Sequence, residues 1–212
     1  MPESPRAQAT MVVALVALLA AIAVVLIVRH GASASPAATT SQVRSQFDGA
    51  TMPPGVRAAN FSLRDQNGLP ITLSHDRGRV VVLTFIHSLC KDTCPFMVEQ
   101  IKGALNALPG SGRNVTVIGV SVDPLQDTIR NRRWFLARHQ MTGRMHFVSG
   151  PPATLRRIWH DYAIQPVSAH FDHSTFVMLI DKRGYERIGD PASQLTPESL
   201  AHDISVLERE RA

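Results

Sequence analysis

The sequence lacks several features that would assign a chain quickly to a class of protein. It has no internal repeat, and only two of its 212 residues are cysteine, at positions 90 and 94. The absence of repeats excludes a solenoid or another repeat architecture. Aromatic residues make up 6% of the chain, but 44% is hydrophobic, so the chain can bury one core and still carry further segments.

The chain is also poor in acidic residues, with a formal net charge of +5 and a pI near 9.9. Four arginines, Arg130, Arg132, Arg133 and Arg138, fall within one expected helix. The sequence contains no nucleic-acid-binding motif, which argues against a nucleic-acid partner. We interpret the cluster as a solvated helix face, with contact to anionic lipid or an acidic protein as the alternative.

One long apolar run, Met11 to Val28, has no charged residue. As a helix it would be about 27 Å long, close to the roughly 30 Å hydrocarbon thickness of a bilayer. A signal peptide is the alternative, because Ala32-Ser33-Ala34 resembles a cleavage site, although the run is longer than a usual signal core. No cysteine directly follows the run, which argues against lipid attachment there. We predict a short tail at 1–10 and a retained transmembrane anchor at 11–29.

The rest of the chain is expected to form a tether and one domain. Residues 30–57 are rich in Ala, Ser, Thr and Pro and lack hydrophobic periodicity, so they indicate a tether, and residues 58–212 form the domain. Apolar runs predict strands at 61–63, 71–73, 80–86, 115–122, 145–148, 174–180 and 185–188. Helices are predicted at 95–108, 129–139, 151–162 and 196–207. This order predicts an α/β fold with a mixed central sheet and an N-terminal β-hairpin.

The two cysteines lie where the strand at 80–86 turns into a helix. Pro95 suits the first helical turn, which places Cys94 at or near the N-cap, where unpaired N–H groups favour a thiolate. Four residues of helix advance about 6 Å, which is compatible with a disulfide or with two sulfurs on one metal ion. A structural disulfide is the plainest interpretation outside the cytoplasm, but so short a loop would restrict the unfolded chain little. Paired cysteines after the first long strand favour a thioredoxin-like fold.

Four short motifs occur along the chain in an order that can be compared with known families. They are Cys90-Lys91-Asp92-Thr93-Cys94-Pro95, Ser121-Val122-Asp123-Pro124 with Asp127-Thr128, Asp172-His173-Ser174 and Leu179-Ile180-Asp181. In this register the chain resembles the Sco/SenC family of membrane-tethered, thioredoxin-like copper proteins, from roughly Asn60 to Leu207. It departs from the family's pattern at Lys91, where proline is usual, and at His87-Ser88-Leu89, where an aromatic residue and a threonine are frequent before the first cysteine.

The resemblance implies that Cys90, Cys94 and His173 bind one copper ion, as Cu(I) or Cu(II). Soft thiolates select Cu(I), and an imidazole suits either oxidation state. Asp123, Asp172 and His87 are candidates to hydrogen-bond to the copper ligands and orient them, and His87 could also act as an accessory ligand. From the residues alone, Asp123 and Asp127 are expected to form a turn and the N-cap of the helix that starts at Thr128. The histidines at 146, 160 and 170 match no motif, and we interpret them as structural or solvent-facing.

The resemblance also implies a partner. Family members deliver copper to, or reduce the cysteines of, the binuclear copper site in a subunit of cytochrome c oxidase. Such a role places the domain on the extracytoplasmic side of the cell membrane and calls for an upstream copper donor or thiol reductant. The protein would then be a metallochaperone rather than an enzyme.

Two other functions compete with this one. A thiol-disulfide oxidoreductase of the thioredoxin type needs only Cys90 and Cys94, as a redox-active dithiol that can form a disulfide, and no metal. A peroxidase of the peroxiredoxin type is weaker, because His87 stands where its threonine is expected.

Overall fold

The computed structural model describes residues 18, 19, 22, 45–166 and 175–211. The chain divides into two compact units, Met1–Val43 and Arg44–Ala212. Within the described residues, no helix is both long enough and apolar enough to cross a membrane. The predicted tail and anchor at 1–29 fall almost entirely outside the described residues, so they stay predictions.

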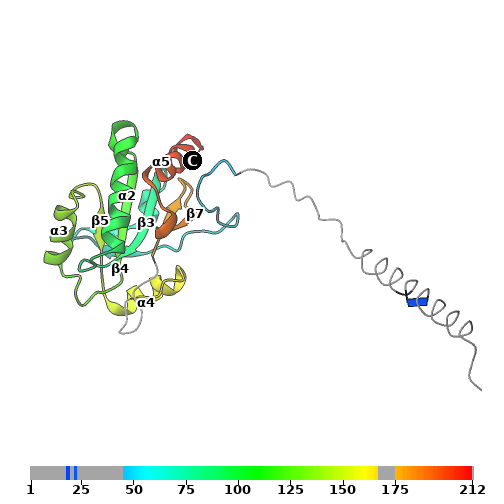
Figure 1. Cartoon of the computed structure of the whole chain (residues 1–212). Helices are drawn as coiled ribbons and strands as arrows, with labels where there is room; N and C mark the ends of the chain where they lie inside the picture. Colours follow the sequence, from blue (N-terminus) through cyan, green and yellow to red (C-terminus); the bar gives the residue numbers. More distant parts are fainter. Residues whose placement is uncertain (1–17, 20–21, 23–44, 167–174, 212) are drawn as a thin grey trace, which may run out of the picture. The chain divides into compact units, whose positions relative to one another are not determined.

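A five-stranded mixed sheet forms the centre of the second unit (Figure 1). The strand order is β5-β4-β3-β6-β7, in which β3, β4 and β5 are parallel and β6 is antiparallel to both β3 and β7. The strands are β3 (Val80–Ile86), β4 (Val115–Ser121), β5 (His146–Val148), β6 (Phe176–Ile180) and β7 (Glu186–Pro191). A separate hairpin pairs β1 (Ser62–Arg64) with β2 (Pro70–Thr72). The predicted hairpin and mixed sheet are therefore confirmed.

Four α-helices surround this sheet. They are α2 (Thr93–Ala107), α3 (Ile129–Arg138), α4 (Pro152–Asp161) and α5 (Pro197–Arg209), with short 3-10 turns η1 (Leu73–Asp76), η2 (Pro109–Gly112) and η3 (Ala192–Gln194). Figure 1 shows α2 and α5 on one side of the sheet and α4 on the other. All four match helices that the sequence predicts, with bounds that differ by one or two residues at most of their ends.

Strand β3 is the middle of the core, because every one of its residues is buried. Val80, Val82 and Ile86 pack with apolar residues of α2, α3 and α5. The alternate residues, including Leu83 and Phe85, pack with α4 and the hairpin. A strand covered on both faces reads as a continuous apolar run, which is why β3 is so clear in the sequence.

The second unit begins earlier than residue 58, where the sequence places the start of the domain. The N–H groups of Asp48 and Gly49 donate to the two carboxylate oxygens of Asp203, at 2.8 and 2.9 Å. The N–H of Met52 donates to the carbonyl of Arg187 in β7, at 2.9 Å. These contacts use backbone donors, so an Ala/Ser/Pro-rich stretch without hydrophobic periodicity gives no sign of them.

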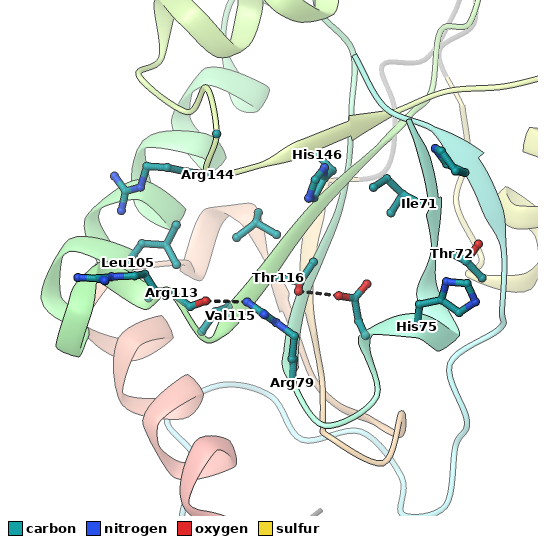
Figure 2. Close-up of a pocket in the computed structure, with 15 residues that line it drawn as sticks. Ile71, Thr72, His75, Arg79, Leu105, Arg113, Val115, Thr116, Arg144 and His146 are labelled. Atoms are coloured by element: carbon teal, nitrogen blue, oxygen red, sulfur yellow. Dashed lines mark hydrogen bonds between the residues drawn. The ribbon is translucent and has the colours of Figure 1, made fainter. Parts of the chain in front are cut away.

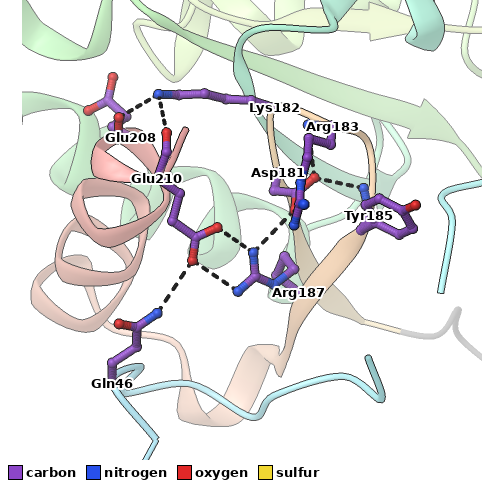
Figure 3. A network of polar contacts seen from close by, with 8 residues as sticks. All are labelled: Gln46, Asp181, Lys182, Arg183, Tyr185, Arg187, Glu208 and Glu210. Carbon is purple, nitrogen blue, oxygen red and sulfur yellow. Dashed lines mark hydrogen bonds and ion pairs between the residues drawn. The ribbon is translucent and has the colours of Figure 1, made fainter. Parts of the chain in front are cut away.

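A polar network closes the edge of the unit between β7 and the end of α5 (Figure 3). The Arg187 guanidinium donates to both carboxylate oxygens of Glu210, at 2.5 and 3.0 Å, and to Asp181 at 3.2 Å. The same Asp181 carboxylate accepts N–H bonds from Arg183 and Tyr185, at 3.0 and 2.9 Å. The turn between β6 and β7 is thereby joined to the C-terminal helix.

Candidate metal site at the end of β3

The two cysteines lie at the end of the sheet where the parallel strands β3 and β4 finish. The N–H of Val122, just after β4, donates to the carbonyl of Ile86, the last residue of β3, at 3.1 Å. The chain then turns and enters α2, whose N-cap is Asp92. Cys94 is the second residue of the helix, as expected from Pro95, which follows it in the first turn.

Three potential ligands converge at this turn. His87, Cys90 and Cys94 each offer one ligand atom, and these atoms all lie within 4.8 Å of one another. Cys94 is fully buried, whereas Cys90 and His87 are partly exposed. Two sulfurs and an imidazole nitrogen form a soft donor set, which suits Cu(I) and also Zn(II).

The start of α2 also acts on the sulfur of Cys90. The N–H of Cys94 donates to Cys90 Sγ at 3.3 Å. Donors at a helix N-terminus, together with the helix dipole, stabilise a thiolate over a thiol. The structure therefore directs a helix N–H group at Cys90, whereas the sequence places that effect at Cys94.

A buried carboxylate holds the turn that carries these residues. Asp127 Oδ1 accepts hydrogen bonds from the N–H and the hydroxyl of Ser88, at 2.7 and 2.6 Å. Its Oδ2 accepts the hydroxyl of Ser121, at 2.5 Å. Burial raises the pKa of Asp127, although the hydrogen bonds from Ser121 and Ser88 oppose that rise. The backbone between His87 and Cys90 is thus fixed to the segment after β4.

The predicted capping role of Asp127 is wrong. Thr128 is the N-cap of α3, and its side chain accepts the N–H of Asn131 at 3.2 Å. Three donors draw the Asp127 carboxylate into the protein instead. Asp123 does form the expected turn, since its carboxylate accepts the N–H of Gln126 at 3.3 Å.

The other histidines and carboxylates named from the sequence are more scattered. His146 lies 3.2 Å from an oxygen of Asp65, and His160 is an exposed side chain on α4. Residues 170, 172 and 173, which include the predicted ligand His173, lie outside the described residues. The described chain resumes at Thr175, which lines a cavity of about 440 Å³ together with Asp92 and Thr93.

A second hollow, of about 510 Å³, opens between this turn and α3. Its lining includes Cys90, Lys91, Trp134 and Arg138. Trp134 is half exposed, and the Arg138 guanidinium lies over its ring at 5.3 Å. The sequence predicts a solvated face for the arginines of α3, which is wrong for the buried Arg132. It assigns no role to Trp134, although a tryptophan among arginines is a recognisable sign of a contact surface.

Comparison with known proteins identifies the family of this chain. The family model described as SCO1/SenC matches residues 50–207. A SCO2-like protein, RP587 of Rickettsia prowazekii (strain Madrid E), is 26% identical over 133 residues, which are 58% of this chain and 64% of that protein. The match therefore spans less than two thirds of the length of that relative.

Solved structures of similar fold cover more of the chain. ScoI of Bradyrhizobium japonicum, solved with copper bound, is 26% identical with a TM-score of 0.62, over 72% of this chain and 99% of that one. BsSco, described as a member of the Sco family of cytochrome c oxidase assembly proteins, is 19% identical with a TM-score of 0.64, over 76% and 98%. At that identity the likeness to BsSco shows the fold alone.

These similarities confirm that the α/β unit has a thioredoxin-like fold. The family model covers well over half of the chain and includes both cysteines. The chain therefore belongs to the SCO1/SenC family.

Proposed function

We propose that this chain binds one copper ion through Cys90, Cys94 and a histidine, and that it works in the assembly of cytochrome c oxidase. The observation that carries the proposal is the convergence of two sulfurs and the His87 imidazole within 4.8 Å at the start of α2. Two thiolates retain Cu(I), and a third nitrogen ligand suits both oxidation states. ScoI, a relative, is solved with copper bound, and BsSco is described as belonging to a family of oxidase assembly proteins.

We infer that His173 supplies the nitrogen ligand. The Asp172-His173-Ser174 motif supports this choice, and so does the position of Thr175, which shares a cavity with Asp92 and Thr93 at the start of α2. The described chain therefore resumes beside the start of α2, the helix that carries Cys94. His87 is the alternative ligand, and its ring is already beside both sulfurs.

The same proposal includes a membrane anchor, a recipient of the copper and a donor. A transmembrane helix at 11–29 would tether the domain to the cell membrane on its extracytoplasmic side. The recipient would be the oxidase subunit with the binuclear copper site, loaded with copper or kept reduced by the chain's own thiols. An upstream copper donor would reload this chain with copper, or a thiol reductant would reduce its cysteines again.

Copper titration of the full chain in nonionic detergent tests the ligand set. We expect one copper per chain and a thiolate-to-Cu(II) absorption band, which Cys90→Ser and Cys94→Ser abolish. His173→Ala should weaken copper binding by roughly 100-fold. Loss of a residue that only hydrogen-bonds to a metal ligand already lowers metal affinity by about 10- to 100-fold, and His173 is proposed as a ligand itself. His160→Ala is the matched control, since this ring is exposed on α4, and it should bind copper as the wild type does.

The remaining outcomes are equally informative. Electron paramagnetic resonance reports whether nitrogen coordinates Cu(II), and loss of that signal in His87→Ala alone would move the ligand from His173 to His87. Retention of full affinity in both histidine variants would refute a site of two sulfurs and one imidazole.

A thiol-disulfide oxidoreductase is the second candidate, and one contact favours it. The N–H of Cys94 lies 3.3 Å from Cys90 Sγ at a helix start, which is a geometry that activates a thiolate. The work on BsSco describes a disulfide switch in that protein. Copper titration of His173→Ala, paired with a redox titration against dithiothreitol, separates the candidates. Both functions keep a reversible dithiol in that variant, but the copper chaperone loses most of its copper affinity, whereas the oxidoreductase needs no metal.

A further inference from the structure

A further cavity lies at the opposite end of β4 from the cysteines (Figure 2). It has a volume of about 440 Å³ and lies between β2, η1, the first residues of β4 and the turn before β5. Three arginines, Arg79, Arg113 and Arg144, are among its lining residues, as are His75 and His146. The residues assigned to copper contribute nothing to it.

No ion pair among the described residues neutralises the positive charge of these arginines. Within the described part of the chain, none of the three forms an ion pair with a carboxylate. Arg79 donates to the carbonyl of Arg113 at 2.6 Å, and Arg113 donates to the carbonyl of Gly110 at 3.2 Å. These bonds orient the side chains without neutralising them.

Arg144 provides an independent observation. Its Nη2 is buried and has no hydrogen-bond partner, and it is the one side-chain nitrogen or oxygen in this position among the described residues. By contrast, the buried Arg132 donates to the carbonyls of Asp127, Arg64 and Phe147. A buried, charged donor without an acceptor is unfavourable, so an anion beside this guanidinium would supply what the protein does not.

The cavity contains little negative charge that would oppose an anion. Asp76 is the one acidic residue among those that line it, and its carboxylate accepts the hydroxyl of Thr116 at 2.7 Å. Figure 2 shows the Arg113 and Arg144 side chains extending in the same direction on one side of the cavity, near Leu105. Three guanidinium groups thus outnumber one engaged carboxylate.

We propose that this cavity binds a phosphate group, either free phosphate or the headgroup of an anionic lipid. The planar fork of a guanidinium matches two phosphate oxygens at once, which favours phosphate over chloride. Ile71 and Leu105 also line the cavity and offer apolar contacts to the organic part of a phosphate ester. The proposal does not depend on copper binding at the other end of the sheet.

The test titrates the full chain in nonionic detergent micelles with inorganic phosphate, at constant ionic strength, and follows the arginine side-chain NMR signals and the melting temperature. We expect saturable shifts at Arg113 and Arg144 and a rise in melting temperature, since a ligand bound by the native state alone stabilises it. Arg113→Gln and Arg144→Gln should weaken binding by about tenfold or more, because each removes a charged fork. Arg156→Gln, an exposed arginine of α4 outside the cavity, is the control and should bind normally.

A second arm distinguishes the two sources of phosphate. The same micelles are doped with phosphatidylglycerol or with phosphatidylcholine, and the same signals are followed. Shifts with free phosphate, with phosphatidylglycerol or with both support the cavity, provided that Arg144→Gln removes them. Absence of saturable shifts in both arms, or an equal loss in Arg156→Gln, would overturn the proposal, because the effect would then be one of overall charge.

Discussion

At the scale of single residues, Asp127 is the side chain that connects the sheet to the candidate copper site. Replacing it with Ala leaves the N–H of Ser88 without its acceptor in a buried position. We expect Asp127→Ala to lower the free energy of unfolding by about 1–3 kcal/mol. Copper affinity should also fall, because the backbone between His87 and Cys90 loses its support. Urea unfolding and copper titration measure the two effects.

Asp127→Asn separates positioning from charge. The amide oxygen still accepts from Ser88, so most of the stability and copper affinity should remain. If Asn were as damaging as Ala, the negative charge rather than the hydrogen bonds would be what the site requires.

At this scale the sequence predicted the cysteine pair and named His87 as a candidate to assist it, but it did not predict the contacts of Asp127. Cys90 and Cys94 stand out because they are the only cysteines and follow an unmistakable strand. The meeting of His87 with both sulfurs depends on the turn conformation, which no periodicity encodes. Asp127 was misassigned because a carboxylate before a helix usually caps it, and only the folded chain brings Ser88 and Ser121 to it.

At the scale of elements, Gly119 shows how closely β3, β4 and β5 are packed. A Cβ built there would meet the Cε of Met145 and come within 2.8 Å of the Cδ1 of Ile86. We expect Gly119→Ala to cost about 1–3 kcal/mol of unfolding free energy by overpacking. Ile86 directly precedes His87, so a shift of Ile86 should also change the copper absorption spectrum.

A double-mutant cycle checks the cause. Met145→Leu removes the methyl group that the new Cβ would meet, so Gly119→Ala should cost less in that background. Equal costs in both backgrounds would show that backbone conformation, not crowding, explains the loss.

Asp65, in the turn between β1 and β2, should make the stability of the protein depend on pH. Asp65 is buried, which opposes its charge, but the N–H groups of Asn67 and Leu69 and the ring of His146 outweigh burial and lower its pKa. An acid with a lowered pKa in the folded state contributes stability above its unfolded pKa and loses it as the pH falls through the folded value. The stability difference between wild type and Asp65→Asn should therefore shrink as the pH falls from about 5 through the lowered pKa of Asp65.

Unfolding curves recorded across that range measure this difference directly. Parallel losses of stability in wild type and variant would mean that Asp65 does not titrate differently in the folded protein.

Elements were more predictable than side-chain contacts. Strands such as β3 and helices such as α4 follow from apolar periodicity, which depends on local sequence alone. The α/β pattern predicted a mixed central sheet but not the order of its strands. The packing of residues 48–52 against β7 and α5 could not be foreseen, since it rests on backbone N–H groups and on a carboxylate about 150 positions away in the sequence.

At the scale of the whole molecule, that packing makes the first residues of the second unit part of its fold. Asp203 is fully buried, and Asp203→Ala removes the acceptor for two N–H groups at once. We expect a loss of about 2–3 kcal/mol in unfolding free energy and faster hydrogen exchange at Asp48 and Gly49. Glu198→Gln, which removes an exposed acid from the same helix, should change stability by less than about 0.5 kcal/mol. Unchanged hydrogen exchange at Asp48 and Gly49 in Asp203→Ala would show that Asp203 does not hold this segment in place.

The unequal exposure of the two sulfurs gives any exchange at this site a fixed sequence of events. An incoming thiolate from another protein can reach Cys90, which is partly exposed, but not Cys94, which is fully buried. Handover of a metal ion and attack on a disulfide would therefore begin at the same outer atom. The sulfur of Cys94 would dissociate last, and only after the first turn of α2 had opened enough to expose it.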